Sequence, residues 1–373
     1  MGILLSGGMA SMLAAVHWHR IAACFALAAA AVFAIGFPAR VLGQRTRILD
    51  QPGERSSHTV PVPRTGGLAI ILGVFFSLLM VVKPSLAFLV AAGIGGLVVA
   101  ISMADDVISI PALPRLGVHL LVAALTVWLV RLALHDLGLP YLHVAISQPV
   151  GLVLAVLFAV AVVNFFNFMD GINGIAVTQG LLGGLTICLL LIQAGGGNSV
   201  LTAAALAGGC LGFLPHNFPR ARMFMGDVGS TTLGFAMAML VLVGAGRTGL
   251  PFVAYMLPLG VFIYDATFTI IKRTLRGENP LRAHREHHYQ LLVRCGWSHA
   301  RVTLLNAALM ALHCVGALIY ANAGDAVRLG VLCVLLGTDG AYSVLVHAYF
   351  RRHGNGQPAT AAARAPAGAK DVP

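Results

Sequence analysis

The sequence predicts an all-α protein that crosses a membrane many times. Of its 373 residues, 58% are hydrophobic and only 10% are charged, and the mean hydropathy is +0.87. A soluble domain carries about 25% charged residues, so a chain of this length could not cover a globule with a solvated surface. Composition therefore argues against a soluble enzyme, a fibrous protein, a disordered chain and a disulfide scaffold.

Apolar stretches recur along the chain, each near the ~20 residues that a helix needs to cross a bilayer. The 43 glycines fit close helix packing in lipid. We expect about eleven membrane helices, over residues 21–39, 67–82, 86–104, 117–134, 149–166, 174–193, 199–215, 228–246, 250–271, 303–320 and 327–349. They would form one membrane-embedded domain, residues 21–350. An N-terminal extension, residues 1–20, would precede it, and a disordered tail rich in Ala, Gly, Pro and Arg, residues 351–373, would follow.

The basic residues predict how these helices are oriented. With the N-terminus outside and the C-terminus cytoplasmic, 19 of the 24 Lys and Arg residues fall in inner segments. Cytoplasmic loops of membrane proteins carry an excess of these residues, so we expect this orientation. In a soluble protein the net charge of +11 would suggest a nucleic-acid partner, but here the membrane accounts for the charge and no nucleic acid is expected.

Most of the 13 acidic residues fall on the same inner side. Asp136 and Asp325 lie outside, Asp265 lies near the inner end of the ninth span, and only Asp339 lies within a span. Acids in membrane proteins are costly to bury and are often functional. Because five inner segments each bring polar groups to one face, we expect a functional site there.

The first of these segments, residues 50–67, combines prolines, glycines and bases. Arg55, His58 and Arg64 could contact phosphate oxygens. The alternative is a basic loop beside anionic lipid head groups, and composition alone favours that alternative.

Asp105 and Asp106 end the third span. At a helix end both carboxylates can reach one polar pocket, where they would suit Mg²⁺ or a positioned phosphate. The alternative is an ordinary pair of interfacial acids.

Asn164, Asn167 and Asp170 recur at every third residue at the end of the fifth span, so they can share one helix face. A nucleotide or a hydrated metal ion would give these polar groups a partner. Hydrogen bonding between helices is the alternative.

Asp227 lies between glycines at the predicted start of the eighth span, preceded by Asn217 and Phe224. A carboxylate at that position could bind Mg²⁺ while backbone N–H groups face a phosphate. The alternative is a helix N-cap followed by a turn.

The longest inner loop carries His284, Arg285, His287 and His288. Cysteine partners at zinc spacing are missing, so contact with an anion is expected before zinc binding. A solvated basic loop is the alternative.

Taken together, the motifs SSHTVPVPRTGG, ADD, NFFNFMDGING, FMGDVGS and AHREHHYQ resemble those of the polyprenyl-phosphate N-acetylhexosamine-1-phosphate transferases, glycosyltransferase family 4. The resemblance covers roughly residues 45–295 and looks nearest to the branch that initiates O-antigen. The histidine-rich stretch differs from that of the peptidoglycan translocase. Many family members carry a second Asp where this chain has Asn173, and Asn at that position would hydrogen-bond a sugar or nucleotide.

The resemblance implies transfer of a sugar 1-phosphate from a UDP-sugar to undecaprenyl phosphate, with release of UMP, to start a cell-surface polysaccharide. The sugar would be an N-acetylated hexosamine or 6-deoxyhexosamine, and the cofactor Mg²⁺ or Mn²⁺. The site would face the cytoplasm in the bacterial inner membrane, among membrane lipids, and a homodimer is left open. The alternatives are a phospho-N-acetylmuramoyl-pentapeptide transferase and, in another class, an anion transporter.

By the same resemblance Asp227 and Asp170 would bind the metal, and Asp105 and Asp106 would position the lipid phosphate or assist the metal. Direct attack by that phosphate and a covalent aspartyl-phosphate route are both open. The remaining candidates would bind substrates; they are Arg55, His58, Arg64, Asn164, Asn167, Asn173, Asn217, Phe224, His284, Arg285, His287 and His288.

Overall fold

The computed structural model describes residues 17–50, 61–82, 86–108, 110–279 and 284–354, and nearly all regular structure in this part of the chain is helical. The helices are α2 (Trp18–Thr46), α3 (Gly66–Val81), α4 (Leu86–Ile108), α5 (Ala112–Val130), α6 (Gln148–Met169), α7 (Ile175–Gln193), α8 (Asn198–Asn217), α9 (Gly226–Thr248), α10 (Phe252–Met256), the 3₁₀ turn η1 (Leu257–Leu259), α11 (Gly260–Leu275), α12 (His288–Arg294), α13 (His299–Asn322) and α14 (Asp325–His353). Two short strands, β1 (Leu49–Asp50) and β2 (Val62–Pro63), pair antiparallel. The all-α prediction is confirmed.

Each of the eleven predicted apolar stretches coincides with helix in the structure. Among the described residues nine helices are long and apolar enough to cross a membrane, with α10 to α11 counted as one. The other two stretches form α3, of 16 residues, and α4, of 23 residues. A multi-pass membrane protein follows from these lengths and compositions.

Two predicted spans differ in detail from the helices that form. The stretch 21–39 lies within α2, which continues to Thr46. The charged residues after Pro38 end the apolar run, but the helix continues through them. The stretch 250–271 is interrupted by η1, where Pro258 has no backbone N–H to give to an α-helical hydrogen bond.

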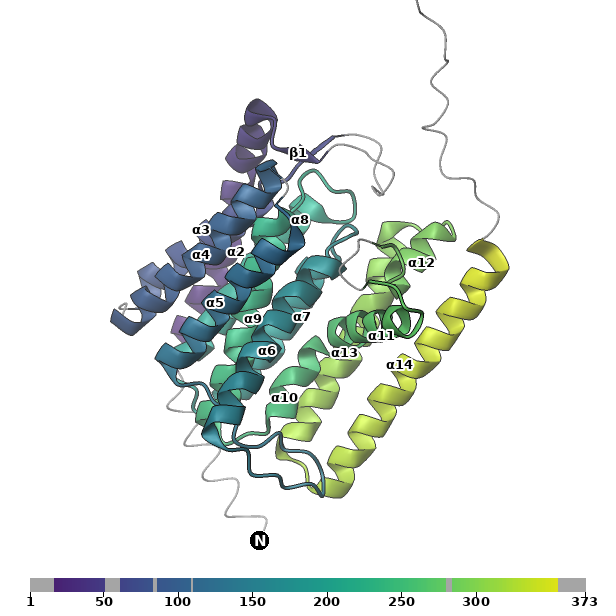
Figure 1. The fold of residues 1–373 in the computed structure, drawn as a ribbon. Coiled ribbons are helices and arrows are strands. Elements are labelled where there is room, and N and C mark those ends of the chain that lie inside the picture. Colours follow the sequence, from purple (N-terminus) through teal and green to yellow (C-terminus); the bar gives the residue numbers. More distant parts are fainter. Residues whose placement is uncertain (1–16, 51–60, 83–85, 109, 280–283, 355–373) are drawn as a thin grey trace, which may run out of the picture.

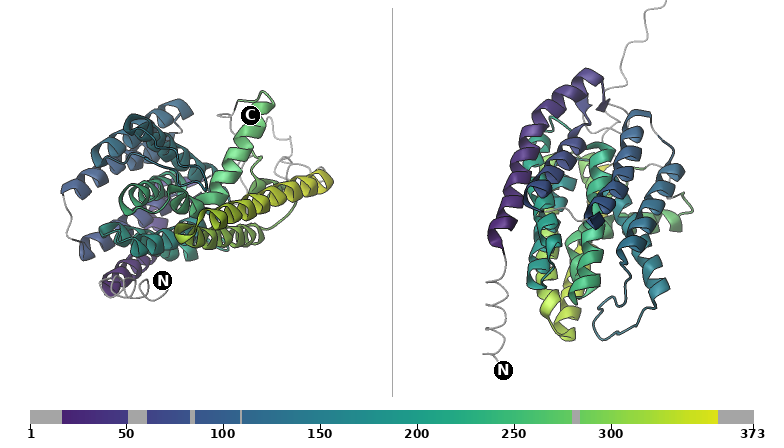
Figure 2. Two further views of the ribbon diagram at one scale, coloured as in Figure 1. Left: turned by 90° about the horizontal axis from the view of Figure 1, so that it is seen from below. Right: turned by 90° about the vertical axis from the view of Figure 1, so that its left-hand side faces the viewer.

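The bundle has a buried centre and two outer sides. The apolar segments of α7, α8 and α9 are mostly buried, whereas those of α2 and α14 mostly face outward. Figure 1 shows α3 and α4 at one side of the bundle and α14 at the other, and both views in Figure 2 place α2 at the periphery. The β1–β2 ribbon and α12 lie at one end of the bundle, the upper end in Figure 1.

Helices α2 and α8 pack closely because α8 has glycines where the two backbones meet. A Cβ atom on Gly208 would overlap the carbonyl of Phe25, and one on Gly212 would overlap the carbonyl of Ala29. Small residues at such crossings let helices approach in lipid, where packing drives association.

The predicted domain limits fall partly outside the described residues. Helix α2 begins at Trp18, so the limit at residue 20 lies within a helix, and α14 continues to His353. Residues 1–16 and 355–373 are not described, so the extension and the disordered tail stay predictions.

The close crossing of α2 and α8 predicts that an added methyl group lowers the stability of the protein at the crossing but not at an open position. Gly212→Ala should lower the thermal unfolding midpoint of the purified protein in detergent, because overpacking a close crossing costs about 1–3 kcal/mol. Gly330→Ala in α14 is the matched control, since a Cβ atom there would have no neighbour within 4 Å and alanine favours helix. Equal midpoints for the two variants would contradict the close approach.

Candidate active site

Polar residues from separate helices meet at the end of the bundle that carries β1 and β2. Arg64 follows β2, forms an ion pair with Asp50 in β1 and lies 3.7 Å from the carboxylate of Asp106 in α4. The ribbon therefore places a base beside the acid pair that ends α4. Arg55 and His58, which belong to the same predicted motif, lie outside the described residues.

Asp106 holds the start of α9. Its carboxylate accepts hydrogen bonds from the backbone N–H groups of Asp227, at 3.1 Å, and Val228, at 3.3 Å. Gly226 has a positive φ of 67°, and a Cβ atom there would lie 2.8 Å from the Asp106 carboxylate. An acid beside the free N–H groups of a helix N-terminus is stabilising, so Asp106 fixes the backbone that carries Asp227.

Arg115, near the start of α5, joins two of the predicted acids. Its guanidinium donates to Asp105 in α4 and, at 3.1 Å, to Asp227 in α9. The backbone N–H of Ile110 also donates to Asp105, at 2.6 Å. In the sequence, Arg115 stands out only as one of the basic residues of the inner segments. The available signal is a base ten residues after an acid, with Pro111 between them at the start of the next helix.

The asparagines that end α6 have different partners. The side-chain amide of Asn167 donates to Asp227, at 2.9 Å, and to Ser230, at 3.2 Å. Asn164 instead donates to the carbonyl of Val160 in its own helix, at 2.7 Å. Of these two side chains, that of Asn167 is the one hydrogen-bonded to the acid cluster.

Asp170 follows α6 directly. Desolvation raises the pKa of this carboxyl group well above its ordinary value, and the nearby carboxylates of Asp227 and Asp106 raise the pKa further. Acids from three helix ends are therefore close enough for their charges to repel one another.

The donor set suits Mg²⁺ better than a metal held by protein ligands alone. Among the described residues no three His, Cys, Asp or Glu side chains form a ready group of metal ligands. Mg²⁺ usually takes one or two carboxylates and completes its shell with water and substrate phosphates. Asp227, whose side chain is 30% exposed, and Asp170 fit that pattern, and their metal-binding role stays a prediction.

Three further candidates hold loops in place at this end. Asn217 is buried, accepts from the N–H of Gly174 at 2.6 Å and donates to the carbonyl of Met223 at 3.0 Å. The side chain of Asn173 donates to the carbonyl of Pro219 at 3.1 Å. The backbone N–H of Phe224 donates to the carbonyl of Pro63 at 2.8 Å. Their contacts with substrate stay predictions.

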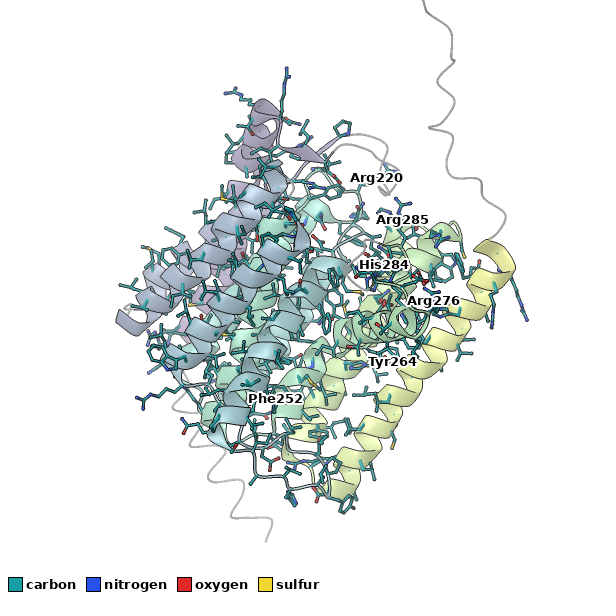
Figure 3. All side chains as sticks on the ribbon, in the orientation of Figure 1. Arg220, Phe252, Tyr264, Arg276, His284 and Arg285 are labelled. Atoms are coloured by element: carbon teal, nitrogen blue, oxygen red, sulfur yellow. The ribbon has the colours of Figure 1, made fainter. Side chains whose placement is uncertain are left out.

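The histidine-rich loop divides into two parts. His284 and Arg285 line a hollow of about 660 Å³ together with residues from the end of α11, and Figure 3 shows them near Arg276. Desolvation lowers the pKa of His284 to about 4, so His284 is neutral at pH 7. His287 and His288, in contrast, are 2% and 0% exposed.

Glu286 neutralises much of the basic charge around the hollow. It accepts hydrogen bonds from Arg273, at 3.0 Å, and Arg276, at 2.7 Å, and lies 3.4 Å from Lys272. The loop therefore presents fewer free positive charges than its composition indicates.

Comparison with known proteins identifies the family. Residues 86–245, which include the four predicted catalytic acids, match the model of glycosyl transferase family 4. The chain is 32% identical over 306 residues to decaprenyl-phosphate N-acetylglucosaminephosphotransferase of Mycolicibacterium smegmatis. This alignment covers 73% of this chain and 75% of that protein. It is 28% identical over 292 residues to the probable undecaprenyl-phosphate N-acetylglucosaminyl 1-phosphate transferase of Bacillus subtilis, covering 77% and 81%.

A third relative represents the alternative considered from the sequence. The phospho-N-acetylmuramoyl-pentapeptide-transferase of Moorella thermoacetica is 32% identical over a shorter alignment of 263 residues, which covers 66% of this chain and 80% of that protein. These similarities and the convergence of acids at one end of the bundle agree with the resemblance seen in the motifs. The chain belongs to glycosyl transferase family 4, among the polyprenyl-phosphate N-acetylhexosamine-1-phosphate transferases.

Proposed function

We propose that this protein transfers an N-acetylated hexosamine 1-phosphate, or its 6-deoxy counterpart, from a UDP-sugar to undecaprenyl phosphate and releases UMP. The observation that carries the proposal is the meeting of Asp105 and Asp106 from α4, Asp170 after α6 and Asp227 from α9 at one end of an apolar bundle. The product would start a cell-surface polysaccharide, with O-antigen as the expected one.

The position of the cluster suits substrates that arrive from two phases. A polyprenyl chain stays in the membrane, while a nucleotide sugar reaches the protein from water. Both substrates carry phosphate, so their reacting groups meet where apolar helices end in polar residues. An anion carrier would instead hold its solute near the middle of the bilayer.

The transfer needs positioning and charge neutralisation more than covalent help from the protein. An oxygen of the lipid phosphate attacks the phosphorus attached to the sugar. The new P–O bond forms as the bond from that phosphorus to the bridging oxygen breaks, and UMP leaves with the bridging oxygen. The second pKa of a phosphate monoester is near ~6, so the attacking oxygen is largely ionised at neutral pH and needs no strong base.

The residues of the site divide this work. Asp227 and Asp170 would bind Mg²⁺, or Mn²⁺ in its place, and the bound ion would neutralise the pyrophosphate of the donor. Asp106 holds the start of α9, so it fixes where Asp227 points. Arg115 lies beside Asp105 and Asp227, where its guanidinium can turn to the anionic phosphates.

Eleven membrane spans with the N-terminus outside and the C-terminus cytoplasmic complete the proposal. This orientation puts the acid cluster on the cytoplasmic side of the bacterial inner membrane. The bias of basic residues toward that side supports it.

A panel of donors tests the proposed reaction. Membranes that contain the protein and undecaprenyl phosphate should transfer radiolabel from UDP-GlcNAc, or from a UDP-6-deoxyhexosamine, into the organic phase, and chelation of divalent cations should stop the transfer. UDP-N-acetylmuramoyl-pentapeptide belongs in the panel as the alternative donor. Radiolabel that stays in the aqueous phase with every donor would argue for a carrier.

The acid cluster predicts the effect of one substitution. Asp227→Asn should lower transfer by about 10²-fold or more, because a neutral amide cannot replace a carboxylate that neutralises charge during reaction. Activity should be measured against the Mg²⁺ concentration. Arg131→Ala, at the opposite end of the bundle, is the control and should leave transfer unchanged. Near-normal turnover of Asp227→Asn would remove this residue from the site.

The orientation predicts a pattern of chemical labelling. In intact cells a membrane-impermeant maleimide should label Tyr141→Cys, in the exposed loop between α5 and α6, but should label Arg222→Cys, after α8, only once the membrane is permeabilised. Both positions are exposed, and the unsubstituted chain gives the background from its own cysteines. The reverse pattern would show that the predicted orientation is wrong.

A further inference from the structure

A buried aspartate lies beneath the histidine-rich loop. Asp265 in α11 is 2% exposed, and the Nδ1 atoms of His287 and His288 each lie 3.1 Å from its carboxylate. The backbone N–H of His288 also donates to this carboxylate, at 3.1 Å, and Thr269 donates at 3.2 Å. A carboxylate buried in a membrane protein is costly unless it is paired and hydrogen-bonded, and the loop supplies most of these partners.

The same contacts fix the start of α12. His287 is the N-cap of this helix, and Gln290 completes a capping box with it. The ring of His288 packs against Tyr264 and Phe268 of α11. Asp265 therefore sets both the backbone and the side chains at the point where the loop becomes helix.

Tyr289, the residue after His288, connects the start of α12 with the acid cluster. The hydroxyl of Tyr289 donates to the carbonyl of Phe168, at 2.9 Å, two residues before Asp170. Gly171 makes this approach possible, because a Cβ atom there would overlap the Tyr289 hydroxyl. The first two residues of α12 thus connect Asp265 with the turn that carries Asp170.

The side chains of the histidine-rich loop differ in how far they are buried. His284 and Arg285 line the hollow, whereas His287 and His288 are enclosed against Asp265. Only the first pair is placed to meet a substrate in this structure. The rings of His284 and His287 lie 4.9 Å apart between their centroids, so the enclosed pair contacts the pair at the hollow.

We propose that Asp265 is a positioning residue of the transferase, and that it acts through His287, His288 and Tyr289. It holds His284 and Arg285 at the hollow and holds the turn with Asp170 beside Asp227. The sugar 1-phosphate of the donor is the group that this loop would contact. The inference rests on the proposed function for its kinetic consequence, but the anchoring of the loop stands on the contacts alone.

The chain offers a matched control elsewhere in the bundle. Asp339 in α14 is also 2% exposed and lies 3.2 Å from Nε2 of His313 in α13. This pair joins the middle of α13 to the middle of α14. Asp339→Asn therefore tests the loss of a buried Asp–His pair without a direct change to the α12 contacts.

The first experiment compares Asp265→Asn with Asp339→Asn in the full-length protein in detergent. Asp265→Asn should reduce kcat with the UDP-sugar by about 10²-fold, because misplacement of a positioning group by about 1 Å has an effect of that size, and it should leave the KM for undecaprenyl phosphate unchanged. Asp339→Asn should keep the wild-type kcat. Thermal midpoints measured on both proteins separate a loss of folding from a loss of rate.

A double-variant cycle then tests whether Asp265 acts through the loop. In a chain that carries both His284→Ala and Tyr289→Phe, the loop contact and the hydrogen bond to Phe168 are already lost, so adding Asp265→Asn should cost much less than it costs alone. Losses that multiply, or equal kcat values for Asp265→Asn and Asp339→Asn, would overturn the proposal.

Limited trypsin digestion measures the anchoring without any assay of activity. Cleavage after Arg285 should be faster in Asp265→Asn than in Asp339→Asn or wild type, because the loop opens more often when its anchor is lost. Equal cleavage rates would overturn the anchoring. A wild-type protein that transfers no sugar from the donor panel would instead refute the proposed function and leave this digestion result to decide the anchor.

Discussion

The site depends on how the start of α9 is held. Asp106 accepts hydrogen bonds from the backbone N–H groups of Asp227 and Val228, and Arg115 and Asn167 donate to the side-chain carboxylate of Asp227. Carboxylates at the edge of an apolar bundle are tolerated only when donors and cations compensate them. Because each compensating group comes from a different helix, the same contacts that stabilise the acids also lock α4, α5, α6 and α9 at one end.

The remainder of the bundle lets that end stay rigid. The mostly buried helices α7, α8 and α9 form its centre, and glycines on α8 bring the peripheral α2 into close contact with it. The opposite side is held differently. Helix α14 buries Asp339 and Ser343 among its few inward residues, so polar contacts attach it to α11 and α13. Two kinds of helix packing thus support the end of the bundle that carries the acid cluster.

Some residues of the candidate site stand out in the sequence and others do not. Asp105, Asp106, Asp170 and Asp227 stood out because acids are rare in this sequence and fall at helix ends. Arg115 did not, because a lone base in an inner segment is also what orientation requires. The histidines all looked alike in the sequence, yet His287 and His288 prove to be buried while His284 faces a hollow.

The sequence by itself determined the membrane class, the positions of the helices and the placement of the polar motifs at helix ends. Those properties follow from local hydropathy and from the charge of neighbouring residues, which a linear chain records directly. The tertiary structure decided which acid pairs with which base, and that Asp265 lies under the histidine-rich loop. Such partners come from helices far apart in the chain, and only the packing of the bundle determines which side chains meet.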